Sequence, residues 1–150
     1  MKFTRKQGHD MKLTLKYQPV AKNAPLFARD IVEVAQQIPG MDLDYSPASL
    51  RHVDAIIEDM RRDGAPLDAV GETLFGFGTY VGEVFVRNAG AVWIDFDESH
   101  RKFTSHAFGI ELPGGAVRNP LGKVFKRFAN GAEDSVEFFY QVATRPRPAP

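Results

Sequence analysis

The sequence predicts an α+β domain in which four or five helices pack on a small antiparallel β-sheet. Apolar residues recur at helical spacing in several long segments, and Pro and Gly residues delimit those segments. A later segment instead alternates apolar and polar residues, as a half-buried strand does. A chain of 150 residues with 43% hydrophobic residues and no evident domain boundary is typical of one globular unit, so we expect a single domain over residues 1–150.

The N-terminal part of the chain predicts a strand and a helix after a polar start. Residues 1–10 are polar and basic, and we expect them to be disordered, as we do the Pro-rich residues 145–150. Apolar and polar side chains alternate over 12–18, which predicts a strand and a candidate member of the sheet. Residues 24–37 are amphipathic at helical spacing, and Pro39-Gly40 ends that helix.

The helix expected over 47–63 has the clearest end signals. Ser46 is a favourable N-cap, and Pro47 occupies the first helical position, where its missing N–H breaks no hydrogen bond. Gly64 supplies the left-handed residue that commonly follows a helix.

The stretch 66–88 is rich in glycine and could form either a phosphate loop or a buried helix. Gly76 and Gly78 fit the G-x-G-x-x-G pattern of dinucleotide sites, but Val81 occupies the third glycine position. The residues before the pattern have helical spacing, whereas that motif follows a strand. The sequence therefore favours a helix over 66–88 and disfavours nucleotide binding.

The glycines of this helix predict close packing along one edge. Gly71, Gly78 and Gly82 line the margin of its apolar face. Each glycine costs up to about 1 kcal/mol relative to alanine in a helix interior, so a stripe of three indicates that another element approaches closely. Gly76 is expected to point outward. Gly78→Leu should therefore destabilise the fold, and Gly76→Ala should be neutral or stabilising.

The C-terminal half predicts the sheet and two further helices. Segments 91–97 and 103–111 are expected to pair as an antiparallel hairpin, with Trp93 on the side opposite the core. The expected core side carries Val92, Ile94 and Phe96. Residues 119–128 have the pattern of a short helix, and 132–144 have that of a longer one. The apolar stripe on one side of the longer helix contains Val136, Phe139, Tyr140 and Ala143.

The predicted hairpin carries the densest group of potential metal ligands, namely Asp95, Asp97, Glu98, His100 and His106. Two carboxylates on one strand face suit a hard cation, or a general base if burial raises a pKa. No recognised ligand spacing is present, and such residues are typical of a half-exposed hairpin, which is the interpretation that we favour. A metal-dependent or hydrolase-like enzyme that uses Asp95, Asp97, Glu98 and His100 is the alternative hypothesis. No catalytic residue is assigned and no metal is expected.

Basic and aromatic residues form a second candidate surface. Its residues are Trp93, Arg118, Lys123, Lys126 and Arg127. If 119–128 is helical, the last three cations share a face next to Phe125 and Phe128, a combination that suits nucleic acid. The two phenylalanines are more simply core residues and the net charge is zero, so nucleic acid is a disfavoured partner.

Composition excludes several other classes. Residues 1–22 carry six Lys/Arg against one Asp, and residues 40–100 carry twelve acids against four bases, within a net charge of zero. The absence of cysteine excludes disulfides and thiolate metal sites. The chain has no signal-peptide pattern and no membrane-length apolar run, so we expect a cytoplasmic protein without a membrane contact or a cofactor.

The pattern SPASLRHVDAIIEDMR followed by ETLFGFGTYVGEVFVRNAGAVW resembles that of a family of small uncharacterised bacterial domains. In these domains of unknown function, a Ser-Pro-capped helix precedes a glycine-rich helix with a G-x-Y-x-G-E-V-like pattern and a Trp-bearing strand. The segment NPLGKVFKRFANGAEDSVEFFY is also similar, so the resemblance covers roughly 43–143. It implies a compact α+β domain and no assigned activity. Without a convincing catalytic set, we expect a non-enzymatic binding or accessory module with a protein partner; the oligomeric state stays open.

Overall fold

A computed structural model describes residues 13–101 and 105–146 and confirms the predicted α+β class. The longer helices are α2 (Ala24–Ala35), α3 (Leu50–Arg62), α4 (Leu67–Ala89), α6 (Pro120–Asn130) and α7 (Val136–Ala143). The single-turn helix α5 spans Glu98–Arg101, and short 3-10 turns lie at Ala21–Asn23, Pro47–Ser49 and Ala132–Asp134. The strands are β1 (Val92–Asp95), β2 (Phe108–Glu111) and β3 (Val117–Arg118). None of the helices in the described residues is long and apolar enough to cross a membrane.

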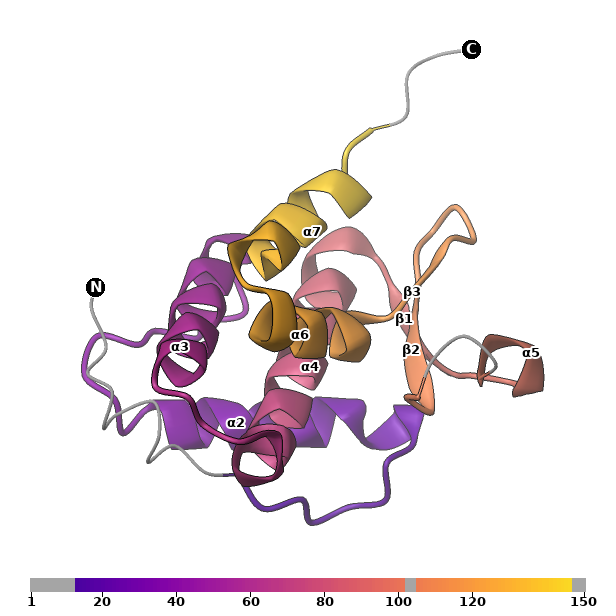
Figure 1. Cartoon of the computed structure of the whole chain (residues 1–150). Coiled ribbons are helices and arrows are strands. Elements are labelled where there is room, and N and C mark those ends of the chain that lie inside the picture. The colour runs from indigo at the N-terminus through magenta and orange to yellow at the C-terminus, as the bar shows by residue number, and fades with distance from the viewer. Residues whose placement is uncertain (1–12, 102–104, 147–150) are drawn as a thin grey trace.

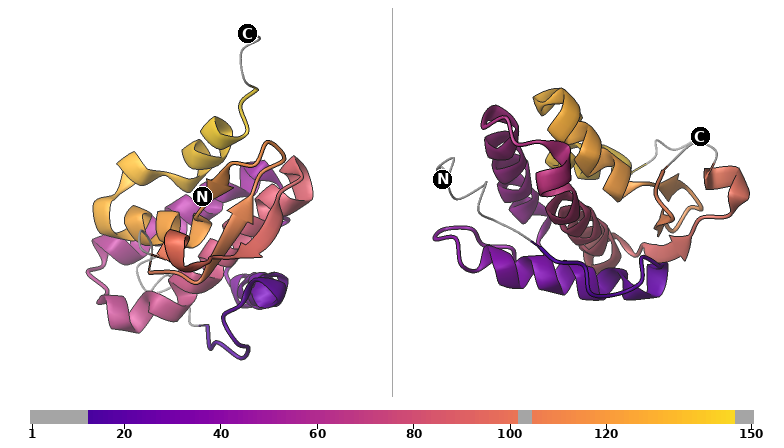
Figure 2. Two further views of the ribbon diagram at one scale, coloured as in Figure 1. Left: turned by 90° about the vertical axis from the view of Figure 1, so that its right-hand side faces the viewer. Right: turned by 60° about the horizontal axis from the view of Figure 1, so that its bottom comes forward.

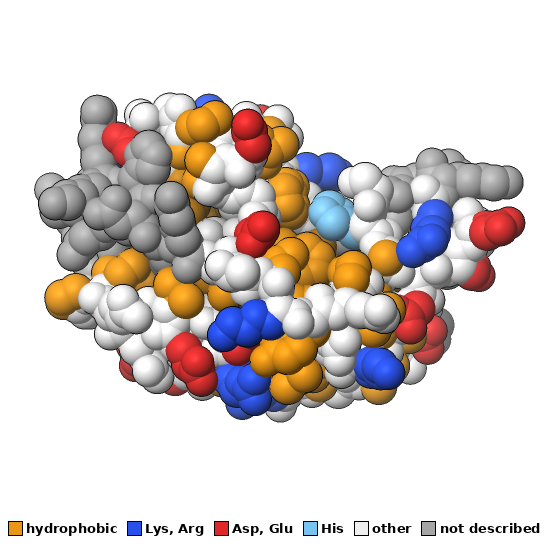
Figure 3. All heavy atoms as spheres, turned by 90° about the horizontal axis from the view of Figure 1, so that it is seen from below, with side chains coloured by type: hydrophobic (Ala, Val, Ile, Leu, Met, Phe, Trp, Pro, Cys, Tyr) orange, Lys and Arg blue, Asp and Glu red, His pale blue; other side chains and the backbone are white. Residues whose placement is uncertain are grey.

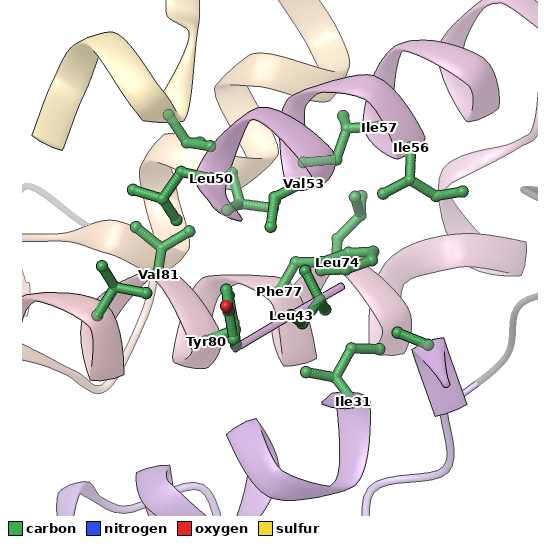
Figure 4. Packing of buried hydrophobic residues seen from close by; sticks show 14 of the residues in the cluster. Ile31, Leu43, Leu50, Val53, Ile56, Ile57, Leu74, Phe77, Tyr80 and Val81 are labelled. Carbon is green, nitrogen blue, oxygen red and sulfur yellow. The ribbon is translucent and has the colours of Figure 1, made fainter. Parts of the chain in front are cut away.

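Helix α4 forms the centre of the molecule. It lies between α2 on one side and the pair formed by α3 and α6 on the other, with the sheet beside its C-terminal half (Figures 1 and 2). Leu74, Phe77 and Val81 of α4 point into the core (Figure 4). Side chains of α3 meet them from above, and those side chains are Leu50, Val53, Ile56 and Ile57. Because these groups are fully buried, apolar burial around α4 is the main source of stability.

The N-cap and the C-terminal glycine predicted for the helix over 47–63, which is α3, are confirmed. The Ser46 hydroxyl accepts a hydrogen bond from the backbone N–H of Ser49 at 3.2 Å, and Gly64 adopts a left-handed φ of +72°. The first turn is 3-10, so the α-helix itself begins at Leu50. These signals are local in sequence, which explains why they could be predicted.

The glycine stripe is confirmed at two positions and wrong at a third. A Cβ on Gly78 would lie 2.7 Å from Cα of Leu121, and one on Gly82 would collide with the ring of Trp93. Gly71, by contrast, has open space where a Cβ would lie. The stripe fails there because neither α6 nor the sheet reaches the first turns of α4 (Figure 1).

The expectation that Gly76 faces outward is also wrong. A Cβ there would lie 2.5 Å from Cδ2 of Leu13 and 3.1 Å from Cβ of Ile31. The cause is α2, which covers the side of α4 that helical periodicity alone left open. Residues 76–85 of α4 are all buried, so this part of the helix has no outward face.

The sheet has the order β1-β2-β3 and is antiparallel throughout. Val92 pairs with Glu111 and Asp95 with Phe108, so the predicted hairpin is present with shorter strands. The helical turn α5 interrupts its connection, and residues 103–104 of the predicted second strand lie outside the described residues.

The prediction of which side chains of β1 face the core is wrong at the start of the strand. Val92 is 55% exposed, whereas the ring of Trp93 lies against α4. Gly82 leaves room for this ring, and Nε1 of Trp93 donates to the Glu83 carboxylate at 2.9 Å. A buried hydrogen-bond partner on α4 therefore outweighs the simple alternation of polarity.

The described residues 13–18 form no strand, which corrects the prediction for 12–18. The backbone N–H groups of Leu13 and Leu15 donate to side chains of α4, namely Thr73 Oγ1 and Glu72 Oε2, each at 3.2 Å. This segment therefore finds its hydrogen bonds on a helix and joins no sheet. Lys12, residues 1–10 and residues 147–150 lie outside the described residues.

Candidate functional site

A groove of about 670 Å³ lies between α7, the turn that joins β2 to β3, and the C-terminal end of α4. In Figure 1, α7 and this turn stand on either side of the upper end of α4. Leu112 and Pro113 line the groove from the turn, and Phe138, Phe139 and Val142 line it from α7. The groove thus joins elements from three separate parts of the sequence.

Helix α7 exposes two large apolar side chains beside this groove. Phe138 is 58% exposed and Val142 is 46% exposed, and the two lie one helical turn apart. Val136 and Tyr140 of the same helix are buried against the core, as the sequence predicts. Because α7 is apolar on almost all sides and only one side meets the core, an apolar surface is left uncovered.

Three cations line the same groove, namely Arg118, Lys123 and Arg145, and its described lining contains no Asp or Glu. Lys123 donates to the Asp134 carboxylate at 2.8 Å, so its charge is largely offset. This bond holds the pKa of Asp134 below its usual value. Nη1 of Arg118 donates to the carbonyl oxygen of Val117 at 2.9 Å.

The start of α7 is held by a residue of α3. The Asp54 carboxylate accepts hydrogen bonds from the Ser135 hydroxyl at 2.7 Å and from the N–H groups of Val136 and Glu137 at 2.8 and 3.1 Å. An anionic acceptor at a helix N-terminus satisfies free N–H groups and favours the helix dipole. Asp54 therefore fixes the position of the helix that carries the exposed apolar pair.

Arg127 of α6 also binds Asp54 and so supports the contact between α3 and α7. Its Nε donates to Asp54 at 3.2 Å and its Nη1 donates to Glu58 at 2.8 Å. The bond from Arg127 lowers the pKa of Glu58, although partial burial opposes the shift. Arg127 is only 5% exposed, so its prediction as a surface-binding cation is wrong. Its side of α6 faces α3, which the pattern of α6 alone did not reveal.

The other residues of the predicted basic surface are divided between two places. Lys126 is exposed and lines a hollow of about 520 Å³, which shares Lys123 and Phe139 with the groove. Trp93 is partly buried between β1 and α4, so it is not part of this surface. Arg118 and Lys123 are therefore the two predicted surface cations that the structure brings to the groove.

The acidic residues predicted as ligands do not converge. Asp95 accepts the backbone N–H of Ala21 at 2.8 Å, and Asp97 accepts the Ser99 hydroxyl at 2.7 Å. Glu98 is exposed in α5, and the side chain of His100 lies outside the described residues. Among the described residues, no group of three or more His, Cys, Asp or Glu side chains is placed to hold a metal ion. The enzyme hypothesis stays a prediction.

His106 lies apart from these acids, in the hollow beside α6. Its ring centroid is 5.1 Å from that of Phe125, and burial lowers its pKa. It therefore packs as a half-buried aromatic ring against α6.

A cluster of hydroxyls near the start of α3 also has a structural role. Tyr80 shares a 2.6 Å hydrogen bond with Ser49 and accepts the backbone N–H of Tyr45 at 2.9 Å. Burial raises the pKa of Tyr80 to about 12, so its hydroxyl stays protonated at neutral pH. These bonds stabilise Tyr45 at a left-handed φ of +64°, a conformation that is costly for a residue with a Cβ.

Comparison with known proteins adds no further assignment. No protein-family model, no curated protein and no solved structure matches the chain. The resemblance to a family of small bacterial domains therefore stays a prediction.

The sequence analysis missed the exposure of Phe138 and Val142 beside the groove. A signal was present, because both residues lie outside the apolar stripe predicted for the last helix, which contains Val136 and Tyr140. Two large apolar residues on the expected solvent side of one helix indicate a contact surface.

Proposed function

We propose that the chain is a non-enzymatic binding or accessory module that contacts a protein partner through the groove beside α7. The observation that carries this proposal is the exposure of Phe138 and Val142, which lie one turn apart on α7 beside the groove. Exposed apolar side chains that cluster beside a groove are typical of protein-binding surfaces. The absence of cysteine is compatible with the cytoplasmic location that we include in the proposal.

A protein segment suits this groove better than a small molecule does. Sites for small ligands are commonly preformed concave pockets that enclose most of the ligand's surface. Here Phe138 has more than half of its surface exposed and stands at the margin of the groove. An apolar partner side chain would cover it, and burial of one such aromatic contributes about 1.5–3 kcal/mol.

The experiment compares partners retained by matched variants of the full chain. Phe138→Ser plus Val142→Ser removes the proposed contact, and Leu67→Ser removes an exposed apolar side chain at the opposite end of α4. Quantitative mass spectrometry of affinity-purified material should find a protein that the unmodified chain and Leu67→Ser retain and the double variant loses. Equal retention by both variants, with melts showing that both are folded, would contradict the proposal.

A further inference from the structure

The charges around the groove specify the chemistry of its partner, and this inference rests on the proposed function. Arg118 and Arg145 lie at the groove without an acidic partner among the described residues. The exposed Lys126 extends the same sign of charge into the neighbouring hollow. The lining of the groove therefore combines apolar side chains with cations.

This arrangement differs from other parts of the surface. On the face seen from below, Lys and Arg side chains lie interspersed with Asp and Glu side chains (Figure 3). The whole chain has a net charge of zero, so a lining with charges of one sign is a local feature. Complementary charge around an apolar contact favours a specific partner and accelerates association.

We propose that the partner segment is acidic and amphipathic, with apolar side chains that cover Phe138 and Val142 and Asp or Glu residues that meet Arg118 and Arg145. A helical segment with apolar residues one turn apart would match the spacing of the exposed pair on α7. Its carboxylates would form charge-assisted hydrogen bonds with the two guanidinium groups.

The same charges disfavour two other occupants. The chain's own segment 146–150, PRPAP, contains no Asp or Glu, and the Arg147 side chain would bring a like charge to the groove. A second copy that docks the same surface by twofold symmetry would place Arg118 and Arg145 against the same cations of its partner. Like charges at an interface are repulsive, so both occupants are less favourable than an acidic segment.

The test pans a phage library of random peptides, each about twelve residues long, against the immobilised full chain. We expect the enriched peptides to combine Leu or Phe with a net negative charge. A synthetic copy of the leading peptide should bind about tenfold more weakly to Arg118→Gln plus Arg145→Gln. A matched control, Lys16→Gln plus Lys22→Gln, removes two exposed cations elsewhere and should leave the affinity within about twofold.

Outcomes that overturn the acidic partner can be distinguished from outcomes that also overturn the proposed function. Enriched peptides that are neutral or basic, and that Phe138→Ser no longer binds, would overturn the acidic partner and leave the groove as a protein-binding site. Binding that Phe138→Ser does not alter, or no enrichment above a blank surface, would overturn the proposed function as well. Sedimentation of the unmodified chain as a dimer that Phe138→Ser dissociates would assign the groove to a second copy and overturn the inference.

Discussion

The carboxylate of Asp54 accepts the backbone N–H of Val136 at 2.8 Å, although 82 residues separate the two along the chain. A residue in the middle of α3 thus supplements the N-cap of α7, Ser135, by accepting the first N–H groups of that helix. Because α7 carries Phe138 and Val142, this bond also sets the shape of the groove. A surface that is ordered before binding loses less conformational entropy when a partner arrives.

Replacing Asp54 should weaken the whole fold. Asp54→Ala removes a capping acceptor from the start of α7 and leaves Arg127 buried with one fewer anionic partner, so we expect a loss of about 2–4 kcal/mol in the free energy of unfolding. Asp42→Ala, at an exposed position, is the control and should change stability by less than about 0.5 kcal/mol. Urea denaturation of both variants measures the difference, and similar losses would show that the cap contributes little.

The free energy of unfolding should fall in acid, because Glu58 becomes protonated. The hydrogen bond from Arg127 lowers the pKa of Glu58 in the folded state below its ordinary value of 4.5. The folded chain therefore binds fewer protons than the unfolded chain, and the contribution is complete above pH 4.5 and lost as the pH falls through the folded pKa. Because Glu58 is partly solvated, we expect a small effect.

Glu58→Gln provides the comparison for this pH dependence. Its free energy of unfolding should lie below that of the unmodified chain at neutral pH, and the gap should narrow as the pH falls below 4.5. Denaturant titrations from about pH 3 to about pH 7 would measure the gap. A gap that is constant with pH would show that Glu58 is not linked to folding through its ionisation.

Two glycines of α4 should respond to alanine in opposite ways. Gly78→Ala places a Cβ 2.7 Å from the backbone of Leu121, so α6 must shift and stability should fall by about 1–3 kcal/mol. Gly71→Ala enters open space within a helix and should raise stability by about 0.5–1 kcal/mol. Thermal melts compare the two variants. Changes of the same sign would contradict the close contact between α4 and α6.

Several features of the packing could be predicted from neighbouring residues alone. The predictions that are wrong fail because of contacts between elements far apart in the sequence. The N-cap at Ser46 and the left-handed Gly64 depend only on neighbouring residues, and both predictions are confirmed. The sequence predicts Arg127 and Gly76 at the surface, because nothing in their own helices shows the elements that cover them. Helix α3 covers Arg127, and α2 covers Gly76. The groove could not be predicted because it joins the ends of α4, α7 and a turn of the sheet.

Divalent cations should leave the melting temperature unchanged, because Asp95 and Asp97 are engaged in separate hydrogen bonds. Thermal shift assays with Mg²⁺, Mn²⁺ and Zn²⁺ would check this expectation. A clear rise that Asp95→Asn plus Asp97→Asn abolishes would instead favour the metal-dependent enzyme.

Site-specific photo-crosslinking tests the protein-binding groove most directly. A benzophenone amino acid replaces Phe138 at the groove in one variant and Leu67, also exposed but distant along α4, in the other. Irradiation of cells that express each variant should yield a discrete adduct with another protein at position 138 and none at position 67. The absence of an adduct at position 138, or the same adduct at both positions, would contradict the proposal.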